Sequence, residues 1–181
     1  MLRRKECGGV AVCQRATRGL DDIGVVGGES AVERTAVTDE IDELTAEITI
    51  RVTTIAPSLL AIVGCGALTA AKIVGETAHA GRFRSKDAYA RHNGTAPLPV
   101  WSSNKQRHRL SRTGNRQLNA ALHRIALTQA RCYQPARELL ERRTNGGDGG
   151  REALRILKRR FSDVVYRAML TDETGSLPRT A

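Results

Sequence analysis

Apolar residues recur at steps of three and four along most of the chain beyond residue 37, which is the spacing of one helical face. Segment 38–55 shows the pattern first: Thr38 is placed to cap a helix, with acids in the first turn, where the helix dipole favours them. Its β-branched end also alternates as a strand does, but the cap and the longer period favour a helix. The apolar face packs within its own domain or pairs with a second copy of the chain. Its members are Ile41, Leu44, Ile48, Val52 and Ile55.

Residues 57–76 predict two short apolar helices joined by a glycine turn. Pro57 suits the first turn of a helix, and Gly64 and Gly66 interrupt the apolar pattern before it resumes. Amides near Gly66 begin the second helix, a position that suits an anion, and Lys72 follows within that helix. The arrangement resembles the helix-hairpin-helix motif, which holds DNA by its phosphates. The alternative is an ordinary helical hairpin whose glycines permit close packing.

The rest of the chain alternates helices with breaks. Ser85 caps a short predicted helix that ends at His92, because the glycine and prolines of NGTAPLP do not continue a helix. A basic loop is predicted next, followed by helices from Asn115 to Cys132, over 136–143 and over 151–170. The residues expected inside are Leu118, Leu122, Ile125, Ala126, Leu154, Leu157, Phe161, Val164 and Val165. The cations expected outside the last apolar face are Arg151, Arg155, Lys158, Arg159 and Arg160.

These elements predict a mainly α fold, a small helical domain that contains the helix-hairpin-helix-like motif and has long flanking helices. Aromatic residues make up 3% of the chain, so aliphatic side chains fill the core, which favours packed helices over a β-sandwich. The predicted organisation is a poorly patterned tail at 1–37, an acidic amphipathic helix at 38–57, a core with the glycine turn and a basic serine-containing segment at 58–135, C-terminal helices at 136–170 and a tail at 171–181.

Positive charge is concentrated in one part of the chain. The formal net charge is +10, and residues 82–131 hold eleven Lys or Arg and a single acid, Asp87. The remaining residues hold eighteen basic and eighteen acidic side chains, so the whole excess lies in this window. A single basic block beside neutral flanks indicates a polyanionic partner. Few aromatics interleave with it, so contact with backbone phosphates is favoured over stacking on single-stranded bases.

Several classes of protein are disfavoured by composition. No uncharged apolar stretch is long enough to span a membrane, and the N-terminus does not match a secretory signal, so a cytoplasmic protein without a membrane partner is expected. The four cysteines form no CxxC pair and have no histidine at metal-ligand spacing. Unpaired thiols and no metal site are therefore expected.

Three stretches in order resemble one family: LLAIVGCGALTAAKIVGE, GRFRSKDAYARHNGTAPLPVWSSNKQRHRLSRTGNRQLNAALHRIALTQAR and EALRILKRRFSDVVYR. They resemble the C-terminal half of the insertion-sequence 110/116/902 transposases, the Piv-like DNA recombinases. The resemblance covers roughly residues 38–170. It implies DNA as a partner, a guide RNA from the mobile element, and DNA transposition as the activity. It also implies a separate N-terminal RuvC-like domain whose acids bind a divalent metal, Mg²⁺. That domain is not recognisable here, so the chain resembles a truncated copy, and no cofactor is expected in it.

The resemblance also implies a catalytic serine that attacks a DNA phosphate. The matching positions are Ser102 and Ser103, and Ser103 is the preferred candidate, although Asn104 stands where the family has glycine. Concentrated positive charge around the transferring oxygens suits phosphoryl transfer. Without the resemblance, both serines are ordinary loop residues, and the alternative function is a helical DNA- or RNA-binding module without catalysis. A third interpretation is a helical protein that assembles with itself through segment 38–55.

The predicted DNA contacts come from separate segments that we expect to converge on one surface. They are Gly64, Gly66, Lys72, Lys105, Arg107, His108, Arg109, Arg112, Asn115 and Arg116.

Overall fold

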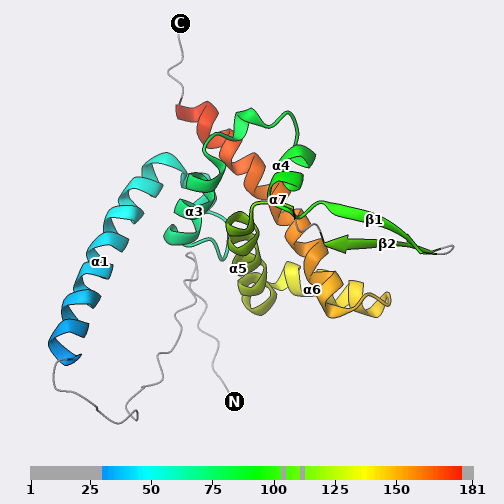
Figure 1. The fold of residues 1–181 in the computed structure, drawn as a ribbon, viewed down its shortest axis with the longest axis horizontal. Helices are drawn as coiled ribbons and strands as arrows, with labels where there is room; N and C mark the ends of the chain where they lie inside the picture. The colour runs from blue at the N-terminus through cyan, green and yellow to red at the C-terminus, as the bar shows by residue number, and fades with distance from the viewer. Residues whose placement is uncertain (1–29, 103–104, 111–112, 177–181) are drawn as a thin grey trace, which may run out of the picture. The chain divides into compact units, whose positions relative to one another are not determined.

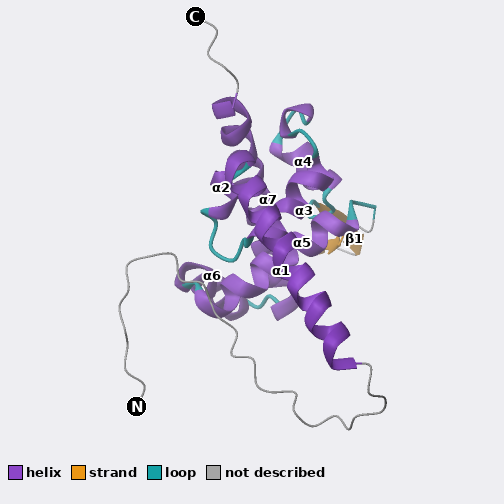
Figure 2. Ribbon diagram, turned by 90° about the vertical axis from the view of Figure 1, so that its left-hand side faces the viewer, coloured by secondary structure: helices purple, strands orange, loops and turns teal. Residues whose placement is uncertain are grey.

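Helices make up most of the described structure, as the ribbon coloured by secondary structure shows (Figure 2). The computed structural model describes the backbone of residues 30–102, 105–110 and 113–176, and the side chains of 36–98 and 113–175. The elements are α1 (Ser30–Ile55), α2 (Pro57–Leu60), α3 (Ala67–Thr77), a 3-10 turn (Ala80–Arg82), α4 (Lys86–His92), β1 (Pro97–Ser102), β2 (Lys105–Leu110), α5 (Arg116–Cys132), α6 (Gln134–Asn145) and α7 (Gly150–Ser176). The predicted mainly α fold is confirmed.

The chain divides into two units, residues 1–44 and residues 45–181. The first unit contains the start of α1, which begins at Ser30 rather than at the predicted Thr38. Residues 30–37 include Ala, Glu and Arg, which are strong helix formers, so the helix extends through Thr38 without needing it as a cap. The second unit holds all the other described elements.

The core of the second unit is built on α5 and α7 (Figure 1). Helix α5 packs against α3, α6 and α7, and α7 packs in addition against α2 and α4. The predicted inner faces are confirmed for most positions, since the buried members are Leu118, Leu122, Ile125, Ala126, Leu157, Phe161 and Val165. The prediction for Val164 is wrong, because this side chain is 42% exposed. Adjacent helical residues point about 100° apart, so only Val165 of this pair faces the core.

Lys158 is a second correction on α7. Its side chain was expected on the outer face with its neighbours, yet the residue is only 8% exposed. Its ammonium Nζ donates to Oδ1 of Asn119 at 2.6 Å, so α5 covers this part of α7. Arg159 is also half-buried, whereas Arg151, Arg155 and Arg160 are exposed as predicted.

The predicted basic loop is wrong, because the segment forms a two-stranded antiparallel hairpin. Strands β1 and β2 pair in register from Pro97 with Leu110 to Ser102 with Lys105. Prolines in this stretch suggested a break, but both strands of a two-stranded ribbon are edges, and an edge strand tolerates a residue without an N–H group. Figure 1 shows the hairpin projecting from the helices of this unit.

Candidate nucleic-acid interface

The glycine turn between α2 and α3 has two glycines with different surroundings. Gly64 has a φ of 83°, and a Cβ atom there would lie 3.1 Å from the Cβ of Thr128 on α5. Side chains are therefore excluded at residue 64 by both backbone conformation and close packing. Close packing, the alternative interpretation of the glycine turn, therefore explains why residue 64 is a glycine.

Gly66 differs from Gly64 because no other residue lies close to the position of a Cβ atom there. It is the N-cap residue of α3, with φ −77° and ψ 169°, and no capping side chain bonds to the first-turn amides. A Cβ atom at this position would meet nothing within 4 Å. The first-turn amides of α3 therefore have no capping side chain, and helix N-termini favour anions. Lys72, half-buried, lies on the same helix.

The base of the hairpin is a tight crossing of two glycines. A Cβ atom on Gly114 would lie 2.2 Å from the backbone N of Gly94, which itself has a φ of 71°. Beside this crossing, the backbone N–H of Asn115 donates to the carbonyl of His92 at 2.6 Å. The crossing brings the end of α4 against the start of α5, and the hairpin emerges between them.

The side chain of Asn115 is engaged in hydrogen bonds within the protein. Its Oδ1 accepts from the amides of Gln117 at 2.9 Å and Leu118 at 3.0 Å, which caps α5. Its Nδ2 donates to Oε2 of Glu76 at 2.7 Å, which ties α5 to α3. The next residue, Arg116, is exposed and forms no ion pair with the described residues. Of these two predicted contacts, Arg116 has the side chain that is available to a ligand.

The hairpin carries most of the other predicted site residues. Lys105, Arg107, His108 and Arg109 lie on β2, and Ser102 is the last residue of β1. Ser103 and Arg112 lie outside the described residues. Positions 105, 107 and 109 share one side of the ladder, because alternate residues of a strand do.

The glycine turn and the hairpin lie at opposite ends of α5. The turn packs at Thr128, whereas the hairpin joins at Asn115. Thirteen residues separate these positions, and at 1.5 Å per residue the separation along the helix is about 20 Å. The predicted contacts therefore form two groups, one at each end of α5, and their convergence on one DNA-binding surface stays a prediction.

The acid in the basic window is neutralised from outside it. Asp87 Oδ1 lies 2.5 Å from a guanidinium nitrogen of Arg159 on α7. Within the window, Arg82 lies over the ring of Phe83 at 4.7 Å and contacts Nε2 of His92 at 3.3 Å. Burial and then the Arg82 charge lower the pKa of His92, so this imidazole is neutral at pH 7. The positive charge of the block is not cancelled by described residues of the block itself.

Two further observations concern metal binding and membrane insertion. In the described part of the chain, no group of three or more His, Cys, Asp or Glu side chains is placed to hold a metal ion. Among the same residues, no helix has the length and apolar character needed to cross a bilayer.

Sequence reasoning missed the position of Lys158, although the sequence contains a signal for it. Lys158 lies four residues after Leu154 and three before Phe161, which is the spacing of the buried face of α7. A charged residue in that phase indicates either a buried polar contact or a site.

Comparison with known proteins found a similarity to one family. Residues 56–141 match the family model described as Transposase IS116/IS110/IS902 family. This range contains the glycine turn, the whole hairpin and α5. The search of curated proteins found no match. Over residues 56–141, the chain is therefore similar to the transposases of the IS116/IS110/IS902 family.

Proposed function

We propose that this chain binds DNA by its phosphates and acts in the transposition of an insertion sequence. The observation that carries the proposal is the family match over 56–141, because this range contains the whole basic window, residues 82–131. Both ends of α5 contribute to the grip. One end offers the open amides at Gly66, and the other offers Arg116 and the cationic positions of β2.

This grip is non-specific in character. Amides and cations that face phosphates position a duplex but do not read its bases. Neutralised phosphates release counterions, so we expect the affinity for duplex DNA to fall steeply as salt rises. Fluorescence anisotropy of a labelled duplex at several salt concentrations measures this dependence. Affinity that does not change with salt contradicts the proposal.

A charge change at Gly66 tests the glycine turn specifically. Gly66→Asp and Gly66→Ser both place a good capping side chain on the open amides of α3, so both preserve or raise stability. Only aspartate adds a negative charge where a phosphate would sit. We expect Gly66→Asp to bind duplex DNA about tenfold more weakly than Gly66→Ser. Equal affinities would remove the turn from the interface.

The serine nucleophile is a separate proposal. We infer from the family resemblance that Ser103, or its neighbour Ser102, attacks a DNA phosphate and holds the strand covalently. A strand-joining assay on element-end DNA, with Mg²⁺ and a RuvC-like domain of a family member supplied in trans, tests it. A covalent protein–DNA adduct that is lost in Ser103→Ala supports the enzyme. An adduct that persists in Ser103→Ala but not in Ser102→Ala identifies Ser102. Absence of any adduct favours the non-catalytic nucleic-acid-binding module.

Two further partners are proposed, the first from the family resemblance and the second from the apolar side chains of α1. We propose a guide RNA of the mobile element, which filter binding with element-derived transcripts tests against unrelated RNA. We also propose a homo-oligomer in which α1 pairs with a second copy, because the apolar side chains of Val37, Ile41, Leu44, Ile50 and Ile55 are each more than half exposed. Light scattering checks the second proposal, and a monomer at high concentration contradicts it. The expected location of all these activities is the cytoplasm.

A further inference from the structure

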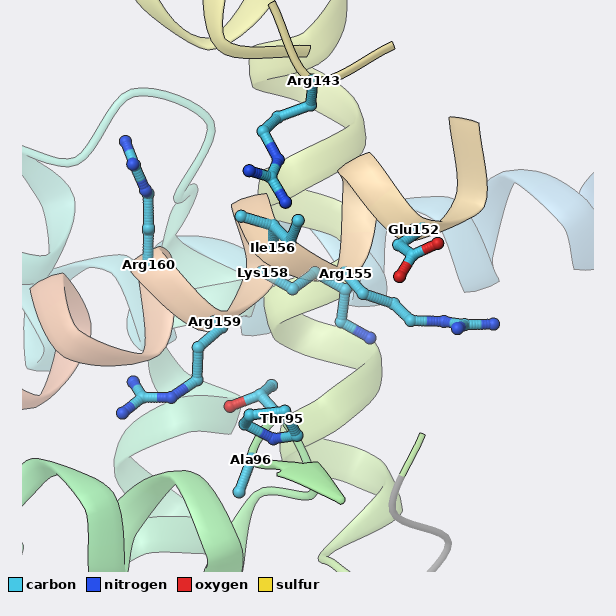
Figure 3. Close-up of a pocket in the computed structure, with 10 residues that line it drawn as sticks. Thr95, Ala96, Arg143, Glu152, Arg155, Ile156, Lys158, Arg159 and Arg160 are labelled. Atoms are coloured by element: carbon cyan, nitrogen blue, oxygen red, sulfur yellow. The ribbon is translucent and has the colours of Figure 1, made fainter. Parts of the chain in front are cut away.

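A pocket of about 390 Å³ opens beside the N-terminal half of α7 (Figure 3). The segment leading into β1 and the end of α6 complete its wall. This volume lies in the range of pockets that hold small ligands. Five of its ten lining residues are cationic and one is acidic; they are Arg143, Arg155, Lys158, Arg159, Arg160 and Glu152.

Part of this charge is already balanced. Arg143 Nε lies 2.6 Å from Oδ2 of Asp148, and Arg159 pairs with Asp87 and Asp163. The remaining three cations, on Arg155, Lys158 and Arg160, form no ion pair with any carboxylate of the described residues. Among the described residues that line the pocket, Glu152 is the only acid. The pocket therefore keeps an excess of positive charge.

Lys158 is the least exposed of these cations. A lysine that is 92% buried usually has a carboxylate partner, but the acceptor for its Nζ is the neutral amide Oδ1 of Asn119, at 2.6 Å. Burial and then the charge of Arg155 lower the pKa of Lys158. An anion in the pocket would offset both effects.

The position of the ammonium is also fixed. Nδ2 of Asn119 donates to the carbonyl of Asn93 at 2.8 Å, which orients Oδ1 toward Lys158. Asn93 is itself buried, and its Nδ2 donates to Oγ of Ser162 at 2.8 Å. This chain of hydrogen bonds holds the cation in place before any ligand arrives, which is the arrangement of a preorganised site.

The rest of the pocket wall is apolar. Ala96, Pro97 and Ile156 line it between the cations, and the aliphatic stems of the arginines add to this surface. In Figure 3, Ile156 lies between Arg143 and Lys158, and Ala96 lies on the opposite wall. An inorganic phosphate would leave this surface unused, whereas a nucleobase attached to a phosphate would cover it.

We propose that this pocket holds one unpaired nucleotide of a DNA strand, with its phosphate at Lys158 and Arg155 and its base against Ala96, Pro97 and Ile156. The proposal extends the DNA-binding function proposed above, because the strand reaches the pocket from the adjacent hairpin. It adds a preference for single-stranded or locally unpaired DNA that the two sites on α5 do not require.

The test compares single-stranded and duplex DNA with the full chain and three variants. Lys158→Met keeps the aliphatic volume and removes the charge, Arg155→Gln changes an exposed residue, and Arg167→Gln makes the same charge change on α7 away from the pocket. We expect Lys158→Met and Arg155→Gln each to weaken binding of a twelve-nucleotide single strand about tenfold. Arg167→Gln should change the affinity for the single strand by less than about twofold. All three variants should change the affinity for duplex DNA by less than about twofold. Thermal unfolding identifies any variant that fails to fold. If Lys158→Met does not fold, the single-strand affinity of Arg155→Gln tests the proposal.

A strand with abasic residues separates a nucleotide site from a bare phosphate site. An abasic strand retains the phosphates but lacks the bases. We expect the wild-type protein to bind the abasic strand about as weakly as Lys158→Met binds the normal strand. An abasic strand that binds as tightly as the normal strand overturns the proposal, as does an equal loss on duplex and single strand in Lys158→Met. A chain that binds no duplex at all overturns the proposed DNA-binding function instead. Normal duplex binding with unchanged single-strand binding in both variants refutes the pocket alone.

Discussion

The Nζ atom of Lys158 on α7 lies 2.6 Å from Oδ1 of Asn119 in the first turns of α5. The same amide donates from Nδ2 to the carbonyl of Asn93, which directly follows α4. One asparagine side chain therefore connects three helices and determines where a buried ammonium is held. Both the stability of this unit and the properties of the pocket depend on this contact.

Replacing Asn119 with alanine should lower the free energy of unfolding by about 1–3 kcal/mol, because a buried ammonium loses its acceptor. The same replacement in a Lys158→Met background should cost less, since no ammonium remains to be left without a partner. Urea unfolding of the four proteins gives the coupling between the two residues. Strictly additive losses would show that the contact contributes nothing of its own.

Lys158 should also make stability depend on pH in the alkaline range. Burial, then Arg155, lowers its pKa, so the folded state binds fewer protons than the unfolded state, whose lysine has a pKa of about 10.4. Stability due to this residue therefore rises as the pH increases from the folded-state pKa toward about 10.4. The pKa of His123 is lowered by burial and then by Lys158, so His123 does not titrate in this window. As the pH rises toward about 10.4, wild type should therefore gain stability relative to Lys158→Met, and parallel pH curves would contradict this.

Gly114 should not tolerate alanine. The added Cβ would lie 2.2 Å from the backbone N and 2.4 Å from the Cα of Gly94, and neither atom can move as a side chain does. We expect Gly114→Ala to lower the free energy of unfolding by about 3 kcal/mol. Gly75→Ala is the matched control, because nothing lies within 4 Å of that position on α3. It should instead raise stability by about 0.5–1 kcal/mol through higher helix propensity.

Glu173 on α7 should stabilise the protein at neutral pH but not in acid. Burial alone would raise its pKa, but hydrogen bonds from the Ala80 amide at 2.5 Å, from His79 and from the Gly81 amide at 3.0 Å outweigh burial and lower it. A carboxyl with a lowered folded-state pKa contributes stability above its unfolded pKa of about 4.3 and loses it as the pH falls through the folded value. Glu173→Gln should therefore be less stable than wild type at pH 7, and the difference should shrink below about pH 4. A difference that stays constant down to pH 2.5 would rule out the carboxylate charge as its cause.

The length of DNA should matter because the two phosphate sites lie about 20 Å apart along α5, which is about six base pairs at 3.4 Å per pair. A DNA duplex shorter than about six base pairs, closed by a DNA loop, reaches only one end of α5. We expect the slope of affinity against salt to steepen with duplex length up to about twelve base pairs and then to level off. A slope that is already maximal for a five-pair duplex would indicate a single site.

Helix α5 shows what could be predicted from the sequence. It begins next to Asn115 and ends at Cys132, and the face through Leu118 to Ala126 is buried, all as expected. These features depend on hydrogen bonds and side-chain spacing within a few turns of one helix, and such local interactions can be read from residue order. The start of α1 was placed too late because a plausible cap at Thr38 outweighed the helix-forming residues before it.

The hairpin was not predicted, because strand pairing joins residues that the local pattern does not connect. Ser102 pairs with Lys105 and Pro97 with Leu110, and the prolines suggested a break unless both strands are edges. The phase of Lys158 was visible in the sequence, but its hydrogen-bond acceptor comes from a different helix, thirty-nine residues away.

The sequence by itself therefore determined the helical class, the basic block, the buried faces of α5 and most of α7, and the family resemblance, because each depends on composition or on spacing along the chain. The tertiary structure alone decided that the glycine turn and the hairpin lie at opposite ends of α5, and that a buried cation borders a pocket. Those relationships arise from packing between segments distant in the chain, where Gly64 meets Thr128 and Lys158 meets Asn119.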